Sequence, residues 1–342
     1  MLGYFSSDLS IDLGTANTLV YVKGKGVVIR EPSIITRHKK TKKVLAIGSE
    51  AKKMMGRTPV SIEVIRPMKD GVISDFDITL AMLSYFVRKV HAKPGRTFVL
   101  PRPKVVIGVP SNISEVERRA VLDAAYGAGA RSAYLIEEGL AAAIGAGLPV
   151  QESVGSMVVD IGGGTTEIAV VSLGGVVVGR SIKIGGDTMD TDIINYIRTR
   201  YSLGIGERTA EEIKIALGGA YVQEVEKQMV VRGRDLENGL PKTIRFSSPA
   251  AREALFGSVN LIVENVKDVV EDTPPELAAD IAERGIMLCG GGAKLSGLAK
   301  LISKETKMSV SIAEDPLLSV VLGAAQVLEN PALFSKVKKV SA

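Results

Sequence analysis

MVVDIGGGTTEIAVV, from Met157 to Val171, is the stretch of this sequence that decides the fold. An apolar run ends at Asp160, three glycines permit backbone conformations closed to residues with a Cβ, two threonines follow, and an alternating apolar run leaves. The pattern predicts a β-hairpin with a tight polar tip. Bare N–H groups at such a tip can bind an anion, and a carboxylate beside them can hold a hydrated cation. Taken alone, the stretch fits a site for a metal-bound polyphosphate and an ordinary glycine-rich turn equally well.

A second copy of this arrangement lies near the N-terminus. In LSIDLGTANTLVYV, from Leu9 to Val22, Asp12 stands 148 residues before Asp160. The same offset relates Gly14 to Gly162, Asn17 to Thr165, Thr18 to Thr166, and Gly26-Val27-Val28 to Gly174-Gly175-Val176. Two copies at half the chain length predict a duplicated fold, with one phosphate hairpin in each half and a nucleotide held between them. The duplication strongly disfavours the ordinary turn.

Length and composition set the class of protein. The 342 residues are too many for one compact core and predict two domains. With 46% hydrophobic and 24% charged residues, the chain is of the globular class. The net charge of +5 is too small to indicate a nucleic-acid partner, although local basic clusters could act at a membrane. The single cysteine, Cys289, rules out an intrachain disulfide and fits a reducing compartment, and His38 and His91 lie too far apart to predict a metal site.

The N-terminal segment does not have the pattern of a signal peptide. MLGYFSSDLSID lacks a basic region and reaches Asp8 and Asp12 early. No apolar run of about 18 residues occurs, because Gly, Pro or a charged residue interrupts every candidate. We therefore expect a cytoplasmic protein whose contact with a membrane is at most peripheral.

Several helices in the first half are indicated by apolar spacing and by capping residues. Asp77 marks the start of one helix, Ser114 and Glu117 form a capping box for another, and an alanine-rich helix from Gly139 is expected to connect the two domains. The second of these helices should turn the following residues inward: Val116, Ala120, Val121, Ala124 and Ala125.

Two helices are also expected in the inserted part of the second half. Asp187 is the expected N-cap of the first, and Thr209 with Glu212 should form a capping box for the next. Glu211 and Lys214, at i and i+3, would lie on one face of that helix and could be no more than a surface ion pair.

Near the C-terminus, a strand from Ile286 to Cys289 leads through a glycine turn to a helix from Ser296. Such a turn lets backbone approach a flat or anionic ligand closely. A last helix, from about Pro316, should pack on the first half, and the Lys-rich tail after it is expected to be loose.

Together these motifs resemble those of the actin, sugar-kinase and chaperone ATPase superfamily, and within it those of the bacterial actins that support rod shape. The resemblance covers nearly the whole chain. Beside the two hairpins it rests on VVIGVP with VERRA, LIEEGLAAAIGAGL, IGERTAEEIK and TPPELAADIAERGIMLCGGGAKLSGL. The chain departs from the family pattern at Gly139, where a proline usually follows the second glutamate of the connecting motif.

The resemblance implies an α/β protein with a duplicated actin-like ATPase fold, in which two domains surround a nucleotide cleft and each carries a small inserted subdomain. The implied first large domain comprises 1–32, 67–145 and 315–342, with an insertion at 33–66. The implied second large domain comprises 146–184 and 242–314, with an insertion at 185–241.

The resemblance also implies which residues bind ATP and Mg²⁺. The hairpin tips would hold the phosphates: Gly14, Thr15, Ala16, Asn17, Gly162, Gly163, Gly164 and Thr166. Ribose and base would lie between two groups, Glu211, Glu212 and Lys214 on one side and Gly290, Gly291, Gly292 and Ala293 on the other. Asp12 and Asp160 would hold the magnesium ion through water. Glu138, with Thr165 beside it, would orient the attacking water and complete the catalytic set.

The implied function is that of a slow, Mg-dependent ATPase coupled to polymerisation. Its filaments would assemble on the inner face of the cytoplasmic membrane and support rod shape by organising cell-wall synthesis. The expected partners are further copies of the chain, the membrane surface and membrane-bound cell-wall elongation proteins, with no nucleic acid. A small-molecule kinase on the same fold is the alternative. A chaperone ATPase is not expected, because no residues remain for an appended peptide-binding domain.

The segment KPGRTFVLPRPK places Phe98, Val99 and Leu100 among basic residues. These three residues either begin a strand or form an exposed apolar tip. Related bacterial actins present an apolar loop here, so the resemblance favours insertion into a membrane. The apolar N-terminus, with Leu2 and Phe5, could add a second contact.

Overall fold

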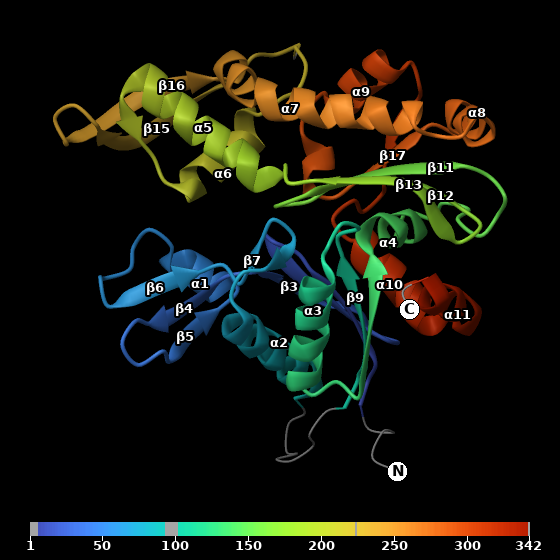
Figure 1. Cartoon of the computed structure of the whole chain (residues 1–342). Coiled ribbons are helices and arrows are strands. Elements are labelled where there is room, and N and C mark those ends of the chain that lie inside the picture. Colours follow the sequence, from blue (N-terminus) through green and yellow to red (C-terminus); the bar gives the residue numbers. More distant parts are fainter. Residues whose placement is uncertain (1–5, 93–101, 223, 341–342) are drawn as a thin grey trace.

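The computed structural model describes residues 6–92, 102–222 and 224–340, which form two lobes, each built on a five-stranded sheet (Figure 1). The strand order in the first lobe is β10 (Ser132–Glu137), β9 (Lys104–Val109), β1 (Leu9–Leu13), β2 (Asn17–Val22) and β3 (Gly26–Pro32). The strand order in the second lobe is β13 (Gly175–Ile182), β12 (Thr166–Ser172), β11 (Ser156–Ile161), β17 (Ile286–Cys289) and β18 (Val310–Ile312).

The two sheets have the same topology, which confirms the duplicated α/β fold. From β3 to β10 in the first sheet, and from β13 to β18 in the second, two antiparallel pairings are followed by two parallel ones. The repeat extends to backbone detail. Gly26 and Gly174, at the 148-residue offset, have φ angles of 79° and 83°, in the left-handed region that favours glycine.

Two helices lie between the sheets. α4 (Glu138–Gly145) packs on β11 and β12, whereas α10 (Ser319–Glu329) packs on β1 and β9. The alanine-rich helix thus lies where the two halves meet, and the C-terminal part of the chain returns to the first lobe, both as expected (Figure 1). α11 (Pro331–Val340) follows α10 on the same lobe.

The central strands are buried on both faces and serve two cores. Val105 and Ile107 of β9 belong to the core under α2 (Phe76–His91) and α3 (Glu115–Gly127), while Val106 between them faces the core around α4 and α10. In β11 the same alternation sends Val159 to the core under α7 (Ser248–Glu271) and Val158 to the core around α4. Because alternate residues pack into different cores, both faces of these strands are apolar, and their sequences are continuous apolar runs.

Each lobe carries a small sheet on the same side of the molecule, so that the two small sheets lie on either side of the opening between the lobes (Figure 1). The first consists of β4 (Ile35–His38), β5 (Val44–Ile47) and β6 (Ile62–Ile65), with α1 (Ser49–Met54). The second consists of β14 (Leu203–Gly204), β15 (Gln228–Asp235) and β16 (Pro241–Ser247), with α5 (Gly186–Tyr201) and α6 (Glu207–Leu217). The exact division into domain ranges stays a prediction.

The remaining elements are short. β7 (Met68–Lys69) and β8 (Val72–Ile73) form a two-stranded turn, and α8 (Pro275–Arg284), the 3₁₀ helix η2 (Gly291–Lys294) and α9 (Leu298–Thr306) complete the second lobe. No helix among the described residues is long and apolar enough to cross a membrane.

Several predicted helix starts are wrong by a few residues. Asp75, rather than Asp77, caps α2, because its carboxylate accepts the Ile78 N–H. Gly185 precedes α5 in the position expected for Asp187, and Gly206 precedes α6, so that Thr209 lies inside that helix.

The capping box of Ser114 and Glu117 is confirmed, but the inward face of α3 is narrower than predicted. Val116 is 80% exposed. The buried Val121 is five positions further along, which places the two about 140° apart around the helix.

Near the C-terminus the glycine turn is followed by η2, and α9 starts at Leu298 instead of Ser296. The tail beyond α10 is not loose but helical. The Asn330 side chain accepts the N–H groups of Ala332 and Leu333, and Leu333 is buried, so that a capped start and an apolar contact fix α11.

The crossing of α4 and α10 generates a prediction about stability. A Cβ added at Gly323 of α10 would overlap the carbonyl oxygen of Ala141 in α4. Gly323→Ala should therefore destabilise the fold by roughly 1–3 kcal/mol, the usual scale of overpacking, and lower the thermal unfolding midpoint measured by circular dichroism. Gly257→Ala in α7 is the matched control, because nothing lies within 4 Å of its added Cβ. Equal midpoints for the two variants would contradict the packing argument.

Candidate functional site

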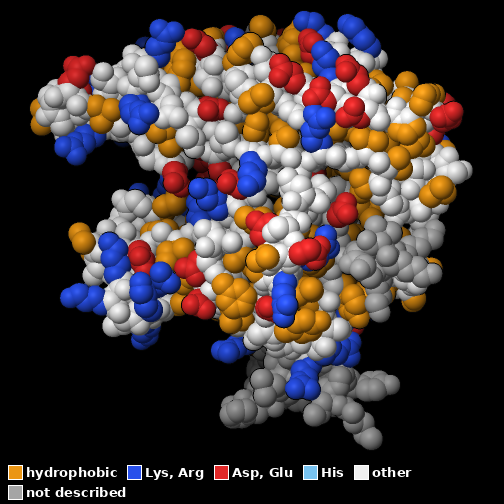
Figure 2. Space-filling view, viewed as in Figure 1, with side chains coloured by type: hydrophobic (Ala, Val, Ile, Leu, Met, Phe, Trp, Pro, Cys, Tyr) orange, Lys and Arg blue, Asp and Glu red, His pale blue; other side chains and the backbone are white. Residues whose placement is uncertain are grey.

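A cleft of about 630 Å³ lies between the two lobes. Figure 2 shows the notch that opens between them, with Lys, Arg, Asp and Glu side chains gathered at its inner end. The tips of the β1–β2 and β11–β12 hairpins both line this cleft. The two halves of the sequence repeat therefore meet at one place.

The two hairpin tips lie so close together that only glycine fits between them. A Cβ added at Gly163 would lie 2.5 Å from the Cβ of Ala16, and one added at Gly164 would lie 2.5 Å from the Thr15 hydroxyl. Gly162, Gly163 and Gly164 all keep φ outside the left-handed region. The argument from backbone freedom is therefore wrong here: space between the lobes, rather than φ, requires Gly163 and Gly164, whereas a Cβ at Gly162 would meet only the Thr165 carbonyl oxygen of its own tip, at 3.2 Å.

Each hairpin brings one carboxylate to the cleft, with Asp160 buried and Asp12 partly buried. Burial raises the pKa of Asp12 to about 7. Burial, with the charges of Asp12 and Glu167, raises the pKa of Asp160 well above its ordinary value. In the described ranges, no three or more His, Cys, Asp or Glu side chains are grouped to hold a metal ion directly. Two carboxylates of this kind fit a hydrated divalent cation, held through water and the oxygens of a ligand.

Glu138 starts α4 at the wall of the cleft, and its side chain is buried. Burial raises its pKa well above the ordinary value, and the charges of Glu167 and of both aspartates add to the shift. A Cβ added at Gly139 would lie 2.8 Å from the Cβ of Ala169 in β12. This close approach leaves no room for a proline ring at this position of the chain.

The residues of the predicted nucleoside region have partners other than one another. Lys214 forms an ion pair of 2.9 Å with Asp190 and donates to the Gly186 carbonyl oxygen at 2.7 Å. Glu211 forms an ion pair of 2.7 Å with Lys52 of the first lobe. The surface ion pair between Glu211 and Lys214 is absent, and both side chains line the cleft.

Three predicted site residues do not line the cleft. Glu212 is half-exposed and paired with Arg208, Thr166 is buried and donates to the Ile184 carbonyl oxygen, and Ala293 is buried. The other predicted residues of the site line it: Asp12, Gly14, Thr15, Ala16, Asn17, Glu138, Asp160, Gly162, Gly163, Gly164, Thr165, Glu211, Lys214, Gly290, Gly291 and Gly292.

Some residues that line the cleft were not predicted from the sequence. Gly71, in the turn between β7 and β8, donates its N–H to the Thr15 hydroxyl at 3.0 Å. Asp187 and Asp190 of α5 line the cleft as well. The turn itself could have been found from the Asp70-Gly71 pair, but no local pattern places it against the hairpins.

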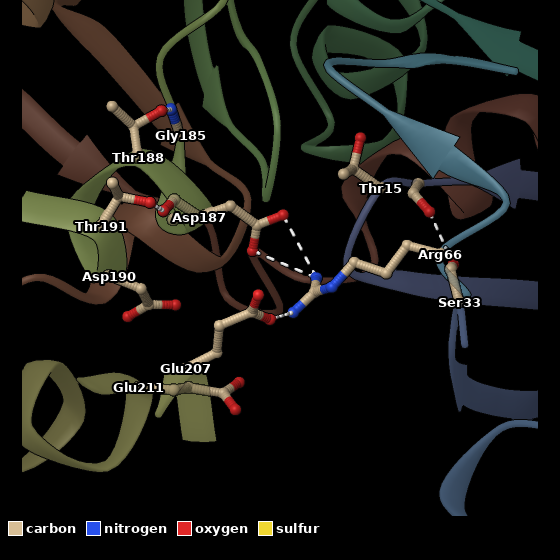
Figure 3. A network of polar contacts seen from close by, with 12 residues as sticks. Thr15, Ser33, Arg66, Gly185, Asp187, Thr188, Asp190, Thr191, Glu207 and Glu211 are labelled. Carbon is tan, nitrogen blue, oxygen red and sulfur yellow. Dashed lines mark hydrogen bonds and ion pairs between the residues drawn. The ribbon is translucent and has the colours of Figure 1, made fainter. Parts of the chain in front are cut away.

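Ion pairs between the lobes cross the cleft. Arg66 of the first lobe lies 2.9 Å from Glu207 and 3.3 Å from Asp187 of the second lobe (Figure 3). The pair of Lys52 and Glu211 forms a second link. Their side chains are 31–58% exposed, so each pair contributes only roughly 0.2–1 kcal/mol.

The predicted membrane residues Phe98, Val99 and Leu100 lie outside the described residues, as does the apolar N-terminus. The described residues that flank these segments are neighbours, because the Arg102 N–H donates to the Ser6 hydroxyl at 2.9 Å.

The fold, with its cleft between two lobes, defines an actin-like class of protein. MreB5 of Spiroplasma citri bound to AMPPNP matches the structure with a TM-score of 0.90 and 36% identity, over 98% of this chain and 99% of that chain. The same protein bound to ADP gives a TM-score of 0.89. The MamK double helical filament, at 22% identity and a TM-score of 0.80, shares the fold over 95% of this chain and 99% of that chain.

Sequence comparison narrows the class. A family model described as MreB/Mbl protein matches residues 6–336. The cell shape-determining protein MreB of Escherichia coli K12 is 53% identical over 331 residues, covering 96% of this chain and 94% of that protein. Mbl of Bacillus subtilis 168 is 48% identical over 326 residues, covering 95% and 97%. The chain belongs to the MreB/Mbl family of cytoskeletal cell-shape proteins, and the kinase alternative is not favoured.

The cross-cleft ion pairs predict how the lobes move. Arg66→Glu should turn attraction to Glu207 and Asp187 into repulsion. The equilibrium constant between the closed and open arrangements of the lobes should then shift toward the open one by about 5-fold or less. Spin labels at exposed turn positions beside the two small sheets, Val60→Cys before β6 and Leu236→Cys after β15, would report a longer distance in electron paramagnetic resonance.

Restoring the pair should restore the distance, so Arg66→Glu with Glu207→Arg should return it toward the wild-type value. Arg200→Glu is the control, because Arg200 pairs at 3.2 Å with Glu253 inside the second lobe. An unchanged distance in the Arg66 variant would show that these pairs do not hold the lobes together.

Proposed function

We propose that this chain is an ATP-dependent, filament-forming cytoskeletal protein that assembles on the inner face of the cytoplasmic membrane and supports rod shape by organising cell-wall synthesis. The observation that carries the proposal is the meeting of two duplicated hairpin tips across one cleft, each with a carboxylate whose pKa is raised. Membership of the MreB/Mbl family and the relatives that determine cell shape support it.

The proposed ligand of the cleft is ATP with Mg²⁺. The structures of MreB5 with AMPPNP and with ADP support a nucleotide at this place. Backbone N–H groups of the two tips would hold the phosphates, and Glu211 and Lys214 would lie beside the ribose and base. Asp12 and Asp160 would hold the metal through water, which removes the energetic cost of two buried negative charges.

The proposed reaction is slow hydrolysis of the γ-phosphate. In such reactions the protein mainly positions water and stabilises charge, and the metal ion neutralises charge on the phosphates. Glu138 would orient the water, and its raised pKa makes it a better proton acceptor than an ordinary carboxylate. Thr165, at the second tip, would orient the same water.

Glu138→Ala should separate binding from hydrolysis. We expect unchanged ATP affinity and ATP-dependent pelleting, with single-turnover phosphate release slower by about 10²-fold, the usual scale for a positioned acid–base group. Asp160→Ala is the contrasting variant, since it should lose tight Mg-ATP binding itself. Phosphate release at the wild-type rate from Glu138→Ala would remove Glu138 from the proposed mechanism.

The proposed partners are further copies of the chain, the membrane surface and membrane-bound cell-wall elongation proteins. Sedimentation with and without ATP, followed by electron microscopy of the pellet, tests self-assembly directly. Filaments that need ATP support the proposal, whereas a protein that binds ATP and never pellets contradicts it.

Membrane attachment is proposed through Phe98, Val99 and Leu100. Burying such side chains contributes roughly 1.5–3 kcal/mol each at best, and a basic residue near anionic lipid adds about 1 kcal/mol. After the cost of immobilising the protein, one loop should bind weakly and reversibly. A filament carries many such loops on one face, so assembly would convert weak contacts into firm binding. The N-terminal residues, which precede Ser6, the partner of the Arg102 N–H, would add to this attachment.

Phe98→Ser with Leu100→Ser should abolish this attachment. In co-sedimentation with anionic liposomes, the wild type should pellet with lipid far better when ATP is present, and the double variant should not, although it still assembles. Exposed Val60→Ser, beside the small sheet of the same lobe, is the control. Undiminished lipid binding by an assembling double variant would rule out the loop as the anchor.

A further inference from the structure

A buried carboxylate, Glu167, joins the two lobes behind the hairpin tips. It lies in β12, only two residues after Thr165, and is 2% exposed. Its backbone pairs in register with Asp160 on the neighbouring strand. Directly paired residues of neighbouring strands face the same side, so Glu167 and Asp160 share one face of the second sheet.

Each oxygen of Glu167 has a different partner. One oxygen accepts from the Ser111 N–H at 3.2 Å and from the Ser111 hydroxyl at 2.7 Å. The other accepts from the Ser181 hydroxyl. Ser111 belongs to the first lobe, directly after β9, whereas Ser181 lies in β13 of the second lobe. A second cross-lobe bond runs beside these, from the Asn112 side chain to the Ser181 carbonyl oxygen at 3.4 Å. We call these four residues the rear junction.

The rear junction is a firmer link than the ion pairs at the mouth of the cleft. Hydrogen bonds to a buried charged group are among the strongest in proteins, and removing one partner leaves that group unsatisfied. Exposed ion pairs, such as those of Arg66, are weak. Relative motion of the lobes therefore opens the mouth first, and the contacts of Glu167 persist only while Ser111 keeps its position against β12.

The rear junction is in contact with the hydrolytic part of the site. The β7–β8 turn lies against both Thr165 and Pro110, the residue next to Ser111. A Cβ added at Gly71 in this turn would lie 2.6 Å from Pro110 and 3.0 Å from Thr165. Gly71 in turn donates to Thr15 of the first tip. The charge of Glu167 also acts on Glu138, since it contributes to the raised pKa of that side chain.

We propose that Glu167 is a positioning residue for ATP hydrolysis, which holds Thr165 and Glu138 in the hydrolytic arrangement only while its bonds to Ser111 join the two lobes. The inference rests on the proposed ATPase function and adds to it a residue that touches neither nucleotide nor metal. It predicts an effect on the rate of hydrolysis without an effect on nucleotide affinity.

The test compares Glu167→Gln, Ser111→Ala and the double variant in two measurements, the dissociation constant for Mg-ATP and single-turnover phosphate release. Glu167→Gln should slow release by about 10-fold or more, the change expected when hydrogen bonds to a buried charge are weakened, and leave the dissociation constant within about 3-fold. Ser111→Ala should slow release less. Because Ser111 acts through Glu167, the double variant should be no slower than Glu167→Gln alone.

The control is a matched pair inside the second lobe. The Ser258 hydroxyl donates to the Asp192 carboxylate, so Asp192→Asn and Ser258→Ala alter the same kind of contact away from the junction and should leave release unchanged. Wild-type release from Glu167→Gln, or a parallel loss of affinity and rate in it, would overturn the positioning role. If Glu167→Gln does not fold, Ser111→Ala tests the positioning role instead. Wild-type phosphate release from Ser111→Ala, or a parallel loss of affinity and rate in it, would then overturn that role. A wild type that binds ATP and releases no phosphate would instead overturn the proposed hydrolysis, and the role of Glu167 with it.

Discussion

The structure depends on how closely the two hairpin tips approach each other. Gly163 and Gly164 of the second tip lie against Ala16 and Thr15 of the first, and no larger side chain fits between them. The same restriction recurs where the lobes meet through helices, since Gly145 of α4 and Gly323 of α10 each lie against the backbone of the other helix. A duplicated fold becomes one binding site only because small residues let its halves touch at these places.

The contacts between the lobes differ in strength along the cleft. At the mouth, Arg66 and Lys52 form partly exposed ion pairs that salt screens and that contribute little. Behind the tips, Glu167 is buried and accepts three hydrogen bonds, two of them from the other lobe. A hinge motion therefore meets little resistance at the mouth and more at the rear, which makes the rear junction the natural pivot.

The sequence repeat was sufficient for the topology, because hairpins and apolar runs are local patterns and the 148-residue offset relates them. The repeat also predicted the two hairpin tips with Asp12 and Asp160, whereas the other predicted residues that line the cleft came from the resemblance to a known superfamily. Contacts between segments distant in sequence were not predictable, and neither Glu167 with Ser111 nor Gly71 with Thr15 leaves a local pattern. Helix starts were missed where several candidate caps stand close together, as with Asp75 and Asp77. Thr166 and Glu212 show a further limit: spacing assigns a residue to a motif but does not fix which way its side chain points.

Charge explains why a ligand should draw the two lobes together. Asp12 comes from one lobe and Asp160 from the other, and burial raises the pKa of both carboxyl groups, which means that their charged forms are unfavourable in the empty cleft. Glu138 and Glu167 add to the same negative field. A cation bound between the aspartates would favour the ionised form of both at once, and it can do so only while the lobes are closed. Binding and closure would then be linked by the same electrostatic free energy, and a ligand carrying a divalent cation would favour the arrangement in which the tips touch and the bonds of Glu167 are formed.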